Sequence, residues 1–344
     1  MAKKIESYTA QTQSGLLLNA NESTSNLNPE LIREIQEAIP SIAFNRYPDN
    51  SQMEIREAYG KAMHLNPACI LAGNGSDQML GLLIGTFLGK GKTLYTFDPD
   101  FSMYDYYASA YEASIKKQEL NPDGTLDLPS FIEEGKKAGV DLVMFSNPNN
   151  PSGNCLSIDQ IRTILEGFSD IPVVVDEAYM EFSDEESALN LIDTYDNLYV
   201  TRTMSKAYSL AGIRLGFLIS SEKNMDAIRP SAVPYALNSL TMRIGKIVLE
   251  HADEFQKSIE ETKKRRKAMY AEVKKLKSVY FWNSQANFLH GRCDHKDALL
   301  KLFAQKGIVI RNYEGKDTFR ITIGGEEENQ MVLDVLKQYE EKYA

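Results

Sequence analysis

LYVTRTMSKAYSLAGIRLGFLIS, residues 198–220, contains two strand-like runs, LYVTRT and GFLIS, separated by a polar loop. Short runs of β-branched and apolar residues of this kind predict strands. The loop places Lys206 among hydroxyl residues, and Arg214 follows shortly before the second run. Taken alone, Lys206 is either an exposed loop lysine or an amine held beside an anion. The sequence on both sides of the loop favours the second interpretation.

The alternation of short apolar runs with helical stretches extends upstream to about residue 68. Further strand candidates are ACILAG, TLYTF, VDLVMFSN and PVVVDEA, and a helix is expected near Asp77. This alternation predicts an α/β fold with a mostly parallel central sheet. The last third differs, because a long charged helix is expected over residues 252–276, followed by ANFLHGR, GIVIRN and FRITIG and a closing helix at about 326–342.

We therefore predict three parts. An N-terminal segment, residues 1–44, is expected to pack with the small domain. Residues 45–240 are expected to form a large cofactor-binding domain, and residues 241–344 a smaller α+β domain.

Composition excludes several classes of protein. The 344 residues carry a net charge of −10, which disfavours binding to nucleic acids or anionic membranes. The first residues, MAKKIESYTAQ, lack the apolar core of a signal peptide, and no apolar run approaches the roughly 20 residues that span a bilayer. Three widely spaced cysteines and four scattered histidines predict neither a disulfide framework nor a metal site. We expect a cytoplasmic protein.

Polar residues follow several of the strand candidates. Asn150 lies in the turn SNPNNPSG, and Asp176 follows the apolar run PVVV. The turn GNGSD, residues 73–77, lies between an expected strand and an expected helix. Open α/β sheets bind ligands at the carboxyl ends of their strands, and helix N-termini bind anions. Each segment taken singly is also compatible with an ordinary turn or surface loop.

The combination of these residues is more informative than any member. Lys206, Asp176 and Asn150 all follow strand candidates, while Arg214 and the GNGSD turn offer donors for a phosphate. A phosphorylated pyridine aldehyde needs this set: a lysine for the aldehyde, a carboxylate for the ring nitrogen, a donor for the ring hydroxyl and a phosphate cup. The pattern therefore predicts pyridoxal 5′-phosphate as the cofactor. GNGSD matches neither dinucleotide-binding nor P-loop motifs.

Motifs of this kind occur in order along nearly the whole chain. They are LNANES (18–23), NRYPD (45–49), GNGSD (73–77), DPDFSMY (98–104), NPNNPSG (147–153), VVVDEAYMEF (173–182), TRTMSKAYSLAGIRLGF (201–217) and FRITIG (319–324). This series resembles the fold-type-I pyridoxal-phosphate aminotransferases and, within them, the histidinol-phosphate aminotransferase family. The resemblance implies the fold-type-I transferase architecture and a homodimer with shared sites.

The resemblance implies a cofactor-binding role for each matching residue. Lys206 would bond to the cofactor aldehyde and later move the proton, and Asp176 would pair with the ring nitrogen. Tyr179 and Asn150 would hydrogen-bond the phenolic oxygen, and Phe101 would stack on the ring. The phosphate-binding residues that the resemblance implies are Gly75, Ser76, Asp77, Thr203, Ser205 and Arg214, with Tyr47 reaching in from a second subunit.

The resemblance also implies the substrates. Arg320, assisted by Asn150, would bind a carboxylate, and Arg311 would meet a substrate phosphate with Tyr8 and Tyr47 as neighbours. The implied reaction converts L-histidinol phosphate and 2-oxoglutarate into imidazole acetol phosphate and L-glutamate. The sequence leaves two alternatives open, because it departs from the family pattern near the substrate's distal end. These are an aromatic amino-acid aminotransferase and a phospho-amino-acid decarboxylase.

Overall fold

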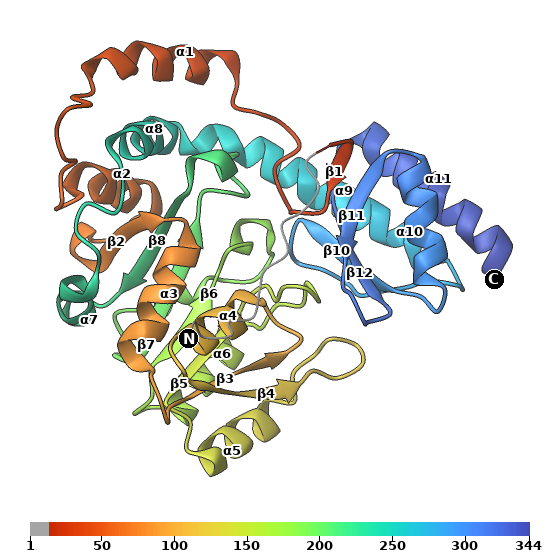
Figure 1. The fold of residues 1–344 in the computed structure, drawn as a ribbon, viewed down its shortest axis with the longest axis horizontal. Helices are drawn as coiled ribbons and strands as arrows, with labels where there is room; N and C mark the ends of the chain where they lie inside the picture. Colours follow the sequence, from red (N-terminus) through yellow and green to blue (C-terminus); the bar gives the residue numbers. More distant parts are fainter. Residues whose placement is uncertain (1–13) are drawn as a thin grey trace, which may run out of the picture.

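The computed structural model describes residues 14–344 and contains two sheets flanked by helices (Figure 1). The larger sheet has the strand order β2-β8-β7-β6-β5-β3-β4. Its strands are β2 (Ile70–Asn74), β3 (Thr93–Asp98), β4 (Ser114–Glu119), β5 (Leu142–Ser146), β6 (Val173–Asp176), β7 (Leu198–Thr203) and β8 (Leu215–Ser220). β8 pairs antiparallel with both of its neighbours, β2 and β7, and the other four strand pairs are parallel, so the predicted mostly parallel sheet is confirmed.

Helices cover both faces of the larger sheet. Val173 and Val175 of β6 belong to one hydrophobic cluster and Val174 to another on the opposite face, and all three side chains are fully buried. Strands buried on both faces are expected to be continuously apolar, which explains the run PVVV. The helices are α1 (Pro29–Ala38), α2 (Met53–Met63), α3 (Ser76–Phe87), α4 (Met103–Ala110), α5 (Leu128–Ala138), α6 (Ile158–Gly167), α7 (Glu222–Ile228), α8 (Ser239–Glu250), α9 (Gln256–Val273), α10 (Lys296–Gln305) and α11 (Glu326–Tyr343).

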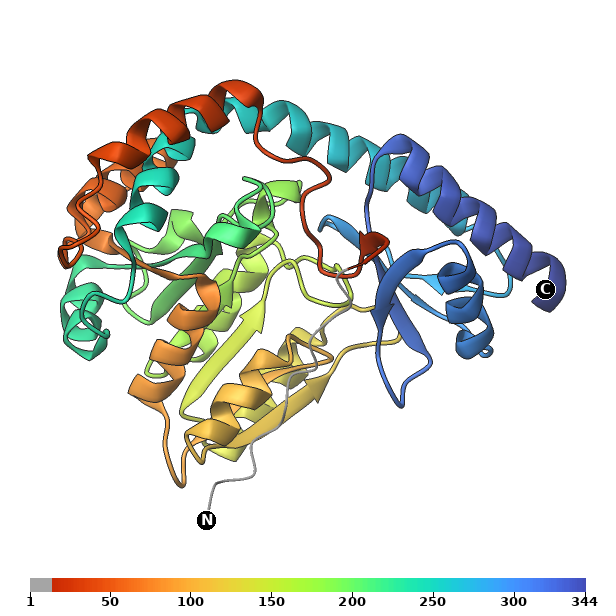
Figure 2. The same cartoon turned by 45° about the horizontal axis from the view of Figure 1, so that its top comes forward.

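The smaller sheet has the order β1-β11-β12-β10-β9. Its strands are β1 (Leu16–Leu18), β9 (Tyr280–Phe281), β10 (Phe288–Arg292), β11 (Ile308–Asn312) and β12 (Thr318–Thr322). β1 pairs in parallel with β11, and the chain then crosses from the smaller sheet to α1 above the larger one (Figure 2). β1, near the start of the chain, therefore belongs to a sheet whose other strands all lie near the end of the chain.

The division into domains remains a proposal. The predicted boundary between residues 240 and 241 falls inside α8, whose Ile247 and Val248 pack in a core cluster with the strands of the larger sheet. In α9, Ile259 belongs to that same cluster, whereas Met269 and Val273 belong to the core of the smaller sheet. We therefore propose α9 as the element that connects the two domains.

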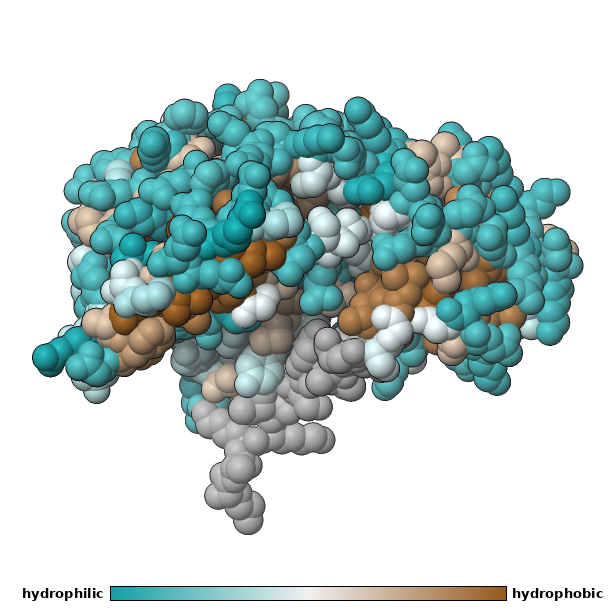
Figure 3. All heavy atoms as spheres, turned by 90° about the horizontal axis from the view of Figure 1, so that it is seen from above, coloured by the Kyte–Doolittle hydropathy of each residue, from teal (hydrophilic) through white to brown (hydrophobic). Residues whose placement is uncertain are grey.

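The surface seen from above is largely hydrophilic, with hydrophobic areas on both the left and the right of the view (Figure 3). Within residues 14–344, no helix combines the length and apolar character needed to cross a membrane.

Candidate active site

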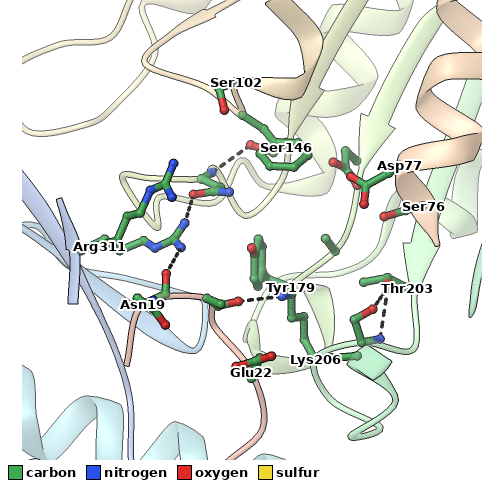
Figure 4. Close-up of a pocket in the computed structure, with 18 of the residues that line it drawn as sticks. Asn19, Glu22, Ser76, Asp77, Ser102, Ser146, Tyr179, Thr203, Lys206 and Arg311 are labelled. Carbon is green, nitrogen blue, oxygen red and sulfur yellow. Dashed lines mark hydrogen bonds between the residues drawn. The ribbon is translucent and has the colours of Figure 1, made fainter. Parts of the chain in front are cut away.

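A cavity of ≈ 310 Å³ lies where the carboxyl ends of β5, β6 and β7 meet the smaller sheet. Most of the residues predicted for the site line it. They are Ser76, Asp77, Phe101, Asn150, Asp176, Tyr179, Thr203, Ser205, Lys206, Arg214, Arg311 and Arg320. Arg311 lies at one end of the cavity, Ser76 and Asp77 lie at the other, and Tyr179 and Lys206 lie between them (Figure 4).

Asp176 is held at the end of β6 by two hydroxyl groups. Thr201 donates to its Oδ1 at 2.8 Å, and Tyr104 of α4 donates to its Oδ2 at 3.1 Å. Burial raises the pKa of Asp176 to about 6, while the hydrogen bond from Thr201 opposes that rise. The carboxylate is therefore ionised at neutral pH inside a buried site, and it can pair with a cationic ring nitrogen.

The next residue, Glu177, points away from the cavity. It pairs with Nε of Arg202 at 2.9 Å, and Arg202 also donates to Glu181 at 2.8 Å. The alternation of side chains along a strand puts Asp176 and Glu177 on opposite faces. The buried Glu177–Arg202 pair joins the ends of β6 and β7, which carry Asp176 and Thr201, and so helps to fix their positions.

Lys206 lies in the wall of the cavity, after β7. Its Nζ donates to the carbonyl of Ala20 at 2.8 Å, a contact between residues 186 positions apart. Burial, together with the positive charge of Arg320, lowers the pKa of Lys206 to about 8. An amine with such a pKa is partly neutral near physiological pH and can act as a nucleophile or a base.

Two glycines bring the turn before α3 close to Arg214. Gly75 has φ +80°, and a Cβ there would lie 2.7 Å from Nη2 of Arg214. A Cβ on Gly216 of β8 would lie 2.2 Å from the backbone nitrogen of Ser76. Arg214 donates to Asp77 at 2.9 Å. The first N–H groups of α3, the Arg214 guanidinium and the nearby hydroxyls thus form a concentrated set of anion donors.

Tyr179 faces the cavity from the segment after β6. Its hydroxyl accepts a hydrogen bond from Nδ2 of Asn21 at 3.0 Å, and burial raises its pKa to about 12. Asn21 is also tied to Thr322 of β12, which receives a hydrogen bond from the Asn21 backbone nitrogen at 3.0 Å. Asn21 therefore links the N-terminal segment, both sheets and a predicted cofactor residue.

Arg320 of β12 is held by contacts from two distant segments. It donates to Oδ1 of Asn150 and, at 3.0 Å, to the carbonyl of Asn19. Arg311 of β11 stands opposite Arg320 in the register of the sheet and also lines the cavity. Two guanidinium groups thus face this end of the cavity, where they can bind a carboxylate or a phosphate.

Three predicted residues do not line this cavity. Gly75 shapes the turn beside it, and Tyr47 is 83% exposed and stacks on Tyr235 with ring centroids 4.9 Å apart. Tyr8 lies outside the described residues. The structure does not bring Tyr47 to the cavity of its own chain, and its role in a second subunit stays a prediction.

Sequence reasoning missed several residues of the site. The further polar and aromatic residues that line the cavity are Asn19, Glu22, Asp100, Ser102, Ser146 and Tyr313. Asp100 accepts hydrogen bonds from the Ser146 hydroxyl and, at 2.7 Å, from the backbone of Phe101, and burial raises its pKa to about 8. Asp100 lies within the motif DPDFSMY, directly before the predicted site residue Phe101, and this position could have identified it as a site residue.

No group of three or more potential metal ligands occurs among residues 14–344. The predicted absence of a metal remains a prediction.

The model of the aminotransferase class I and II family matches residues 13–336. The chain belongs to this family, and it is an aminotransferase. The histidinol-phosphate aminotransferase of Clostridium kluyveri is 37% identical over 93% of this chain and 92% of the relative. That of Pyrococcus furiosus is 38% identical over 94% of this chain and 92% of the relative. The predicted family resemblance is therefore confirmed.

The solved structures confirm the predicted fold class. The histidinol-phosphate aminotransferase of Sinorhizobium meliloti, solved in complex with pyridoxal-5′-phosphate, superposes with a TM-score of 0.84. It is 20% identical in sequence, and the match covers 95% of this chain and 92% of that structure. At this identity the likeness shows the shared architecture.

Proposed function

We propose that the chain uses pyridoxal 5′-phosphate to transfer the amino group of L-histidinol phosphate to 2-oxoglutarate, giving imidazole acetol phosphate and L-glutamate. The observation that carries this proposal is the arrangement of one cavity. Lys206 and Asp176 lie between an anion-binding turn at one end and two arginines at the other. The curated relatives carry the same activity in their names.

The donor set fits the cofactor. The turn before α3 offers backbone N–H groups, hydroxyls and Arg214 to a phosphate, and Asp176 offers a carboxylate to a ring nitrogen. Tyr179 and Asn150 would offer hydrogen bonds to a phenolic oxygen, and Phe101 would offer an aromatic face. When bound, pyridoxal phosphate supplies an electron-withdrawing ring that stabilises negative charge on the substrate carbon next to the reacting nitrogen.

The chain's own residues supply binding, orientation and proton transfer. Lys206 can release a proton at a pH near its lowered pKa of about 8 and take it up again, so it can carry the proton between two carbon atoms. Thr201 and Tyr104 keep Asp176 oriented toward the cavity. The ionised carboxylate then favours a protonated ring nitrogen through charge pairing.

The arginine end suits two anionic substrates in turn. A guanidinium fork matches both carboxylate and phosphate oxygens. Arg311 would bind the phosphate of histidinol phosphate, and it would then bind the distal carboxylate of 2-oxoglutarate. Arg320, with Asn150, would bind the carboxylate next to the reacting carbon.

We also propose a homodimer that shares its active sites. Phe44, Tyr47, Val233 and Tyr235 are 71, 83, 67 and 49% exposed, which is unusual for large apolar side chains gathered on neighbouring segments. In a symmetric dimer the same patch would meet its copy and would carry Tyr47 toward the partner's cavity. A Tyr47→Asp change should lower the molecular mass measured by light scattering. A monomeric parent protein would overturn this part of the proposal. The cytoplasmic location stays a prediction.

The cofactor is tested by colour and by trapping. The purified protein incubated with pyridoxal phosphate should turn yellow, and borohydride followed by peptide mass spectrometry should find the reduced cofactor on Lys206. A protein that stays colourless with excess cofactor would contradict the proposal. Lys223, which is 76% exposed and paired with Asp196, should stay unmodified and serves as the control lysine.

The substrate is tested by a panel. We expect kcat/KM for histidinol phosphate to exceed the values for phenylalanine, tyrosine and histidine. A preference for the aromatic amino acids would favour the aromatic aminotransferase alternative. Release of carbon dioxide from a phosphorylated amino acid would favour the decarboxylase.

A further inference from the structure

A second, smaller cavity adjoins Lys206. It has a volume of ≈ 20 Å³, and Lys206 and Glu22 line both this cavity and the larger one. Most of its other lining residues are polar, and they include Ser258 and Thr262 of α9 and Asn287, which precedes β10. Lys206 is therefore in contact with two separate spaces, one suited to substrates and one too small for them.

Asn287 lines this cavity and has an unused hydrogen-bond acceptor. Its side chain is 3% exposed, and its Nδ2 donates to the carbonyl of Asn21 at 3.0 Å. Its Oδ1 has no hydrogen-bond partner within residues 14–344. Buried polar atoms in proteins are almost always paired with protein groups or with ordered water. This oxygen therefore indicates a ligand that donates a hydrogen bond.

The other polar groups of the cavity complement the same ligand. An ammonium group has three donors, and Lys206 uses one on the carbonyl of Ala20. Thr262 donates its hydroxyl proton to the carbonyl of Ser258 at 2.8 Å and accepts from Nη2 of Arg265 at 3.4 Å, which leaves its oxygen one further acceptor site. A small molecule that accepts one hydrogen bond and donates two matches Lys206, Asn287 and Thr262 together.

Water has this chemistry and this size. A buried water needs at least about 10–15 Å³ and two to four polar partners. The cavity provides ≈ 20 Å³ and, in these residues, three partners. Glu22 is exposed, so the cavity's wall also includes a carboxylate in contact with solvent.

We propose that this cavity binds one ordered water, which gives Lys206 a route for proton exchange with solvent through the smaller cavity and Glu22. A proton leaves the Lys206 ammonium for the water oxygen, and the water releases one of its own protons to Glu22 and the bulk solvent. The return of a solvent proton by the same path restores every bond. The exchange role rests on the proposed aminotransferase function, whereas the water site does not.

The water site is tested by crystallography at better than about 2 Å, where ordered waters with three partners are visible. The parent protein and a Thr262→Ile variant, whose larger side chain fills the cavity, would be compared. The matched control is Thr163→Ile on α6, because Thr163 also donates to the carbonyl four residues earlier, at 2.8 Å, but is exposed. We expect a water on Oδ1 of Asn287 in the parent and the control, and its loss in Thr262→Ile.

The exchange route is tested with an amino donor that carries deuterium on the reacting carbon. We expect Thr262→Ile to retain a several-fold larger fraction of the transferred deuterium than the parent or Thr163→Ile. Ser258→Val provides a second cavity-filling variant if Thr262→Ile does not fold.

Each outcome decides one part of the proposal. A parent structure without the water overturns the site, and a displaced water with unchanged deuterium retention overturns the route. A parent protein without amino-transfer activity would overturn the proposed function and with it the route, while the crystallographic result would still decide the water site.

Discussion

The two ends of the cavity are built in different ways. The cofactor end is made from β6, β7 and the turn before α3, all parts of one buried sheet, and neighbouring strands position its groups, as Thr201 does for Asp176. The substrate end is made from β11, β12 and the segment after β1, on the smaller sheet. There Arg320 is held by Asn150 and Asn19, which are 170 and 301 positions away in sequence. Substitutions on the smaller sheet can therefore change the substrate preference, while the larger sheet keeps the cofactor-binding groups in place.

The largest expected effect is at the cofactor end. Lys206→Ala should reduce kcat by at least roughly 10³-fold, because the group that we propose moves the proton is lost. Equilibrium dialysis should still detect bound pyridoxal phosphate, since the phosphate donors and Asp176 remain. Lys223→Ala, a surface change, is the control and should have parental activity. Full activity in Lys206→Ala would end the assignment.

At the substrate end, Arg311→Ala should act selectively. Loss of a charge-assisted hydrogen bond costs roughly 1.5–3 kcal/mol, so kcat/KM for histidinol phosphate should fall roughly 10- to 150-fold. The same variant should lose much less activity with phenylalanine, which has no phosphate. An equal loss for both donors would mean that Arg311 does not bind the phosphate.

A smaller effect should follow from Thr201→Val, which removes a hydrogen bond to the ionised form of Asp176. That hydrogen bond lowers the Asp176 pKa, which burial raises to about 6, so its loss should raise the pKa further. Protonation of Asp176 should weaken the binding of pyridoxal phosphate. As the pH is lowered from 8 to 5, the dissociation constant of the variant should therefore begin to increase at a pH roughly half to one unit higher than that of the parent. Titration of the free cofactor is common to both proteins and cancels in the comparison. Thr86→Val, which removes an exposed hydroxyl that donates to the carbonyl of Leu82 at 2.8 Å, should match the parent.

The smallest expected effect concerns His290, which stacks on Trp282 with ring centroids 4.4 Å apart and faces Arg320 across the strands. Burial lowers the pKa of His290 from 6.5 to about 3. The unfolded chain binds a proton below pH 6.5 that the folded protein does not, so His290 reduces stability as the pH falls from 6.5 toward 3.

Replacing His290 with Leu removes this dependence. Between pH 7.5 and 5.5, the free energy of unfolding of His290→Leu should rise by roughly 1 kcal/mol relative to the parent. Urea unfolding at the two pH values measures it, and His295→Gln, at an exposed position, is the control. If the difference in free energy of unfolding between His290→Leu and the parent were the same at both pH values, His290 would be protonated in the folded state.

The sequence predicts the cofactor end better than the substrate end for a physical reason. Asp176 ends strand β6 and Lys206 lies three residues after strand β7, so local patterns locate them. Asn21 shows no such pattern, because its role depends on contacts with Tyr179 and Thr322, 158 and 301 positions away. The pairing of β1 with β11 and the position of α8 against the larger sheet likewise depend on tertiary packing.

The parallel pairing of β1 with β11 also has a consequence for how the protein is made. Leu16 pairs with Ile308, and the carbonyl of Ala20 receives the hydrogen bond from Lys206. During translation, the segment around Ala20 leaves the ribosome early but cannot complete its sheet until residues 308–312 have followed. Such distant pairings form slowly. The nascent chain can therefore fold its larger sheet first, and the lysine's surroundings are assembled only after the last strands of the smaller sheet have emerged.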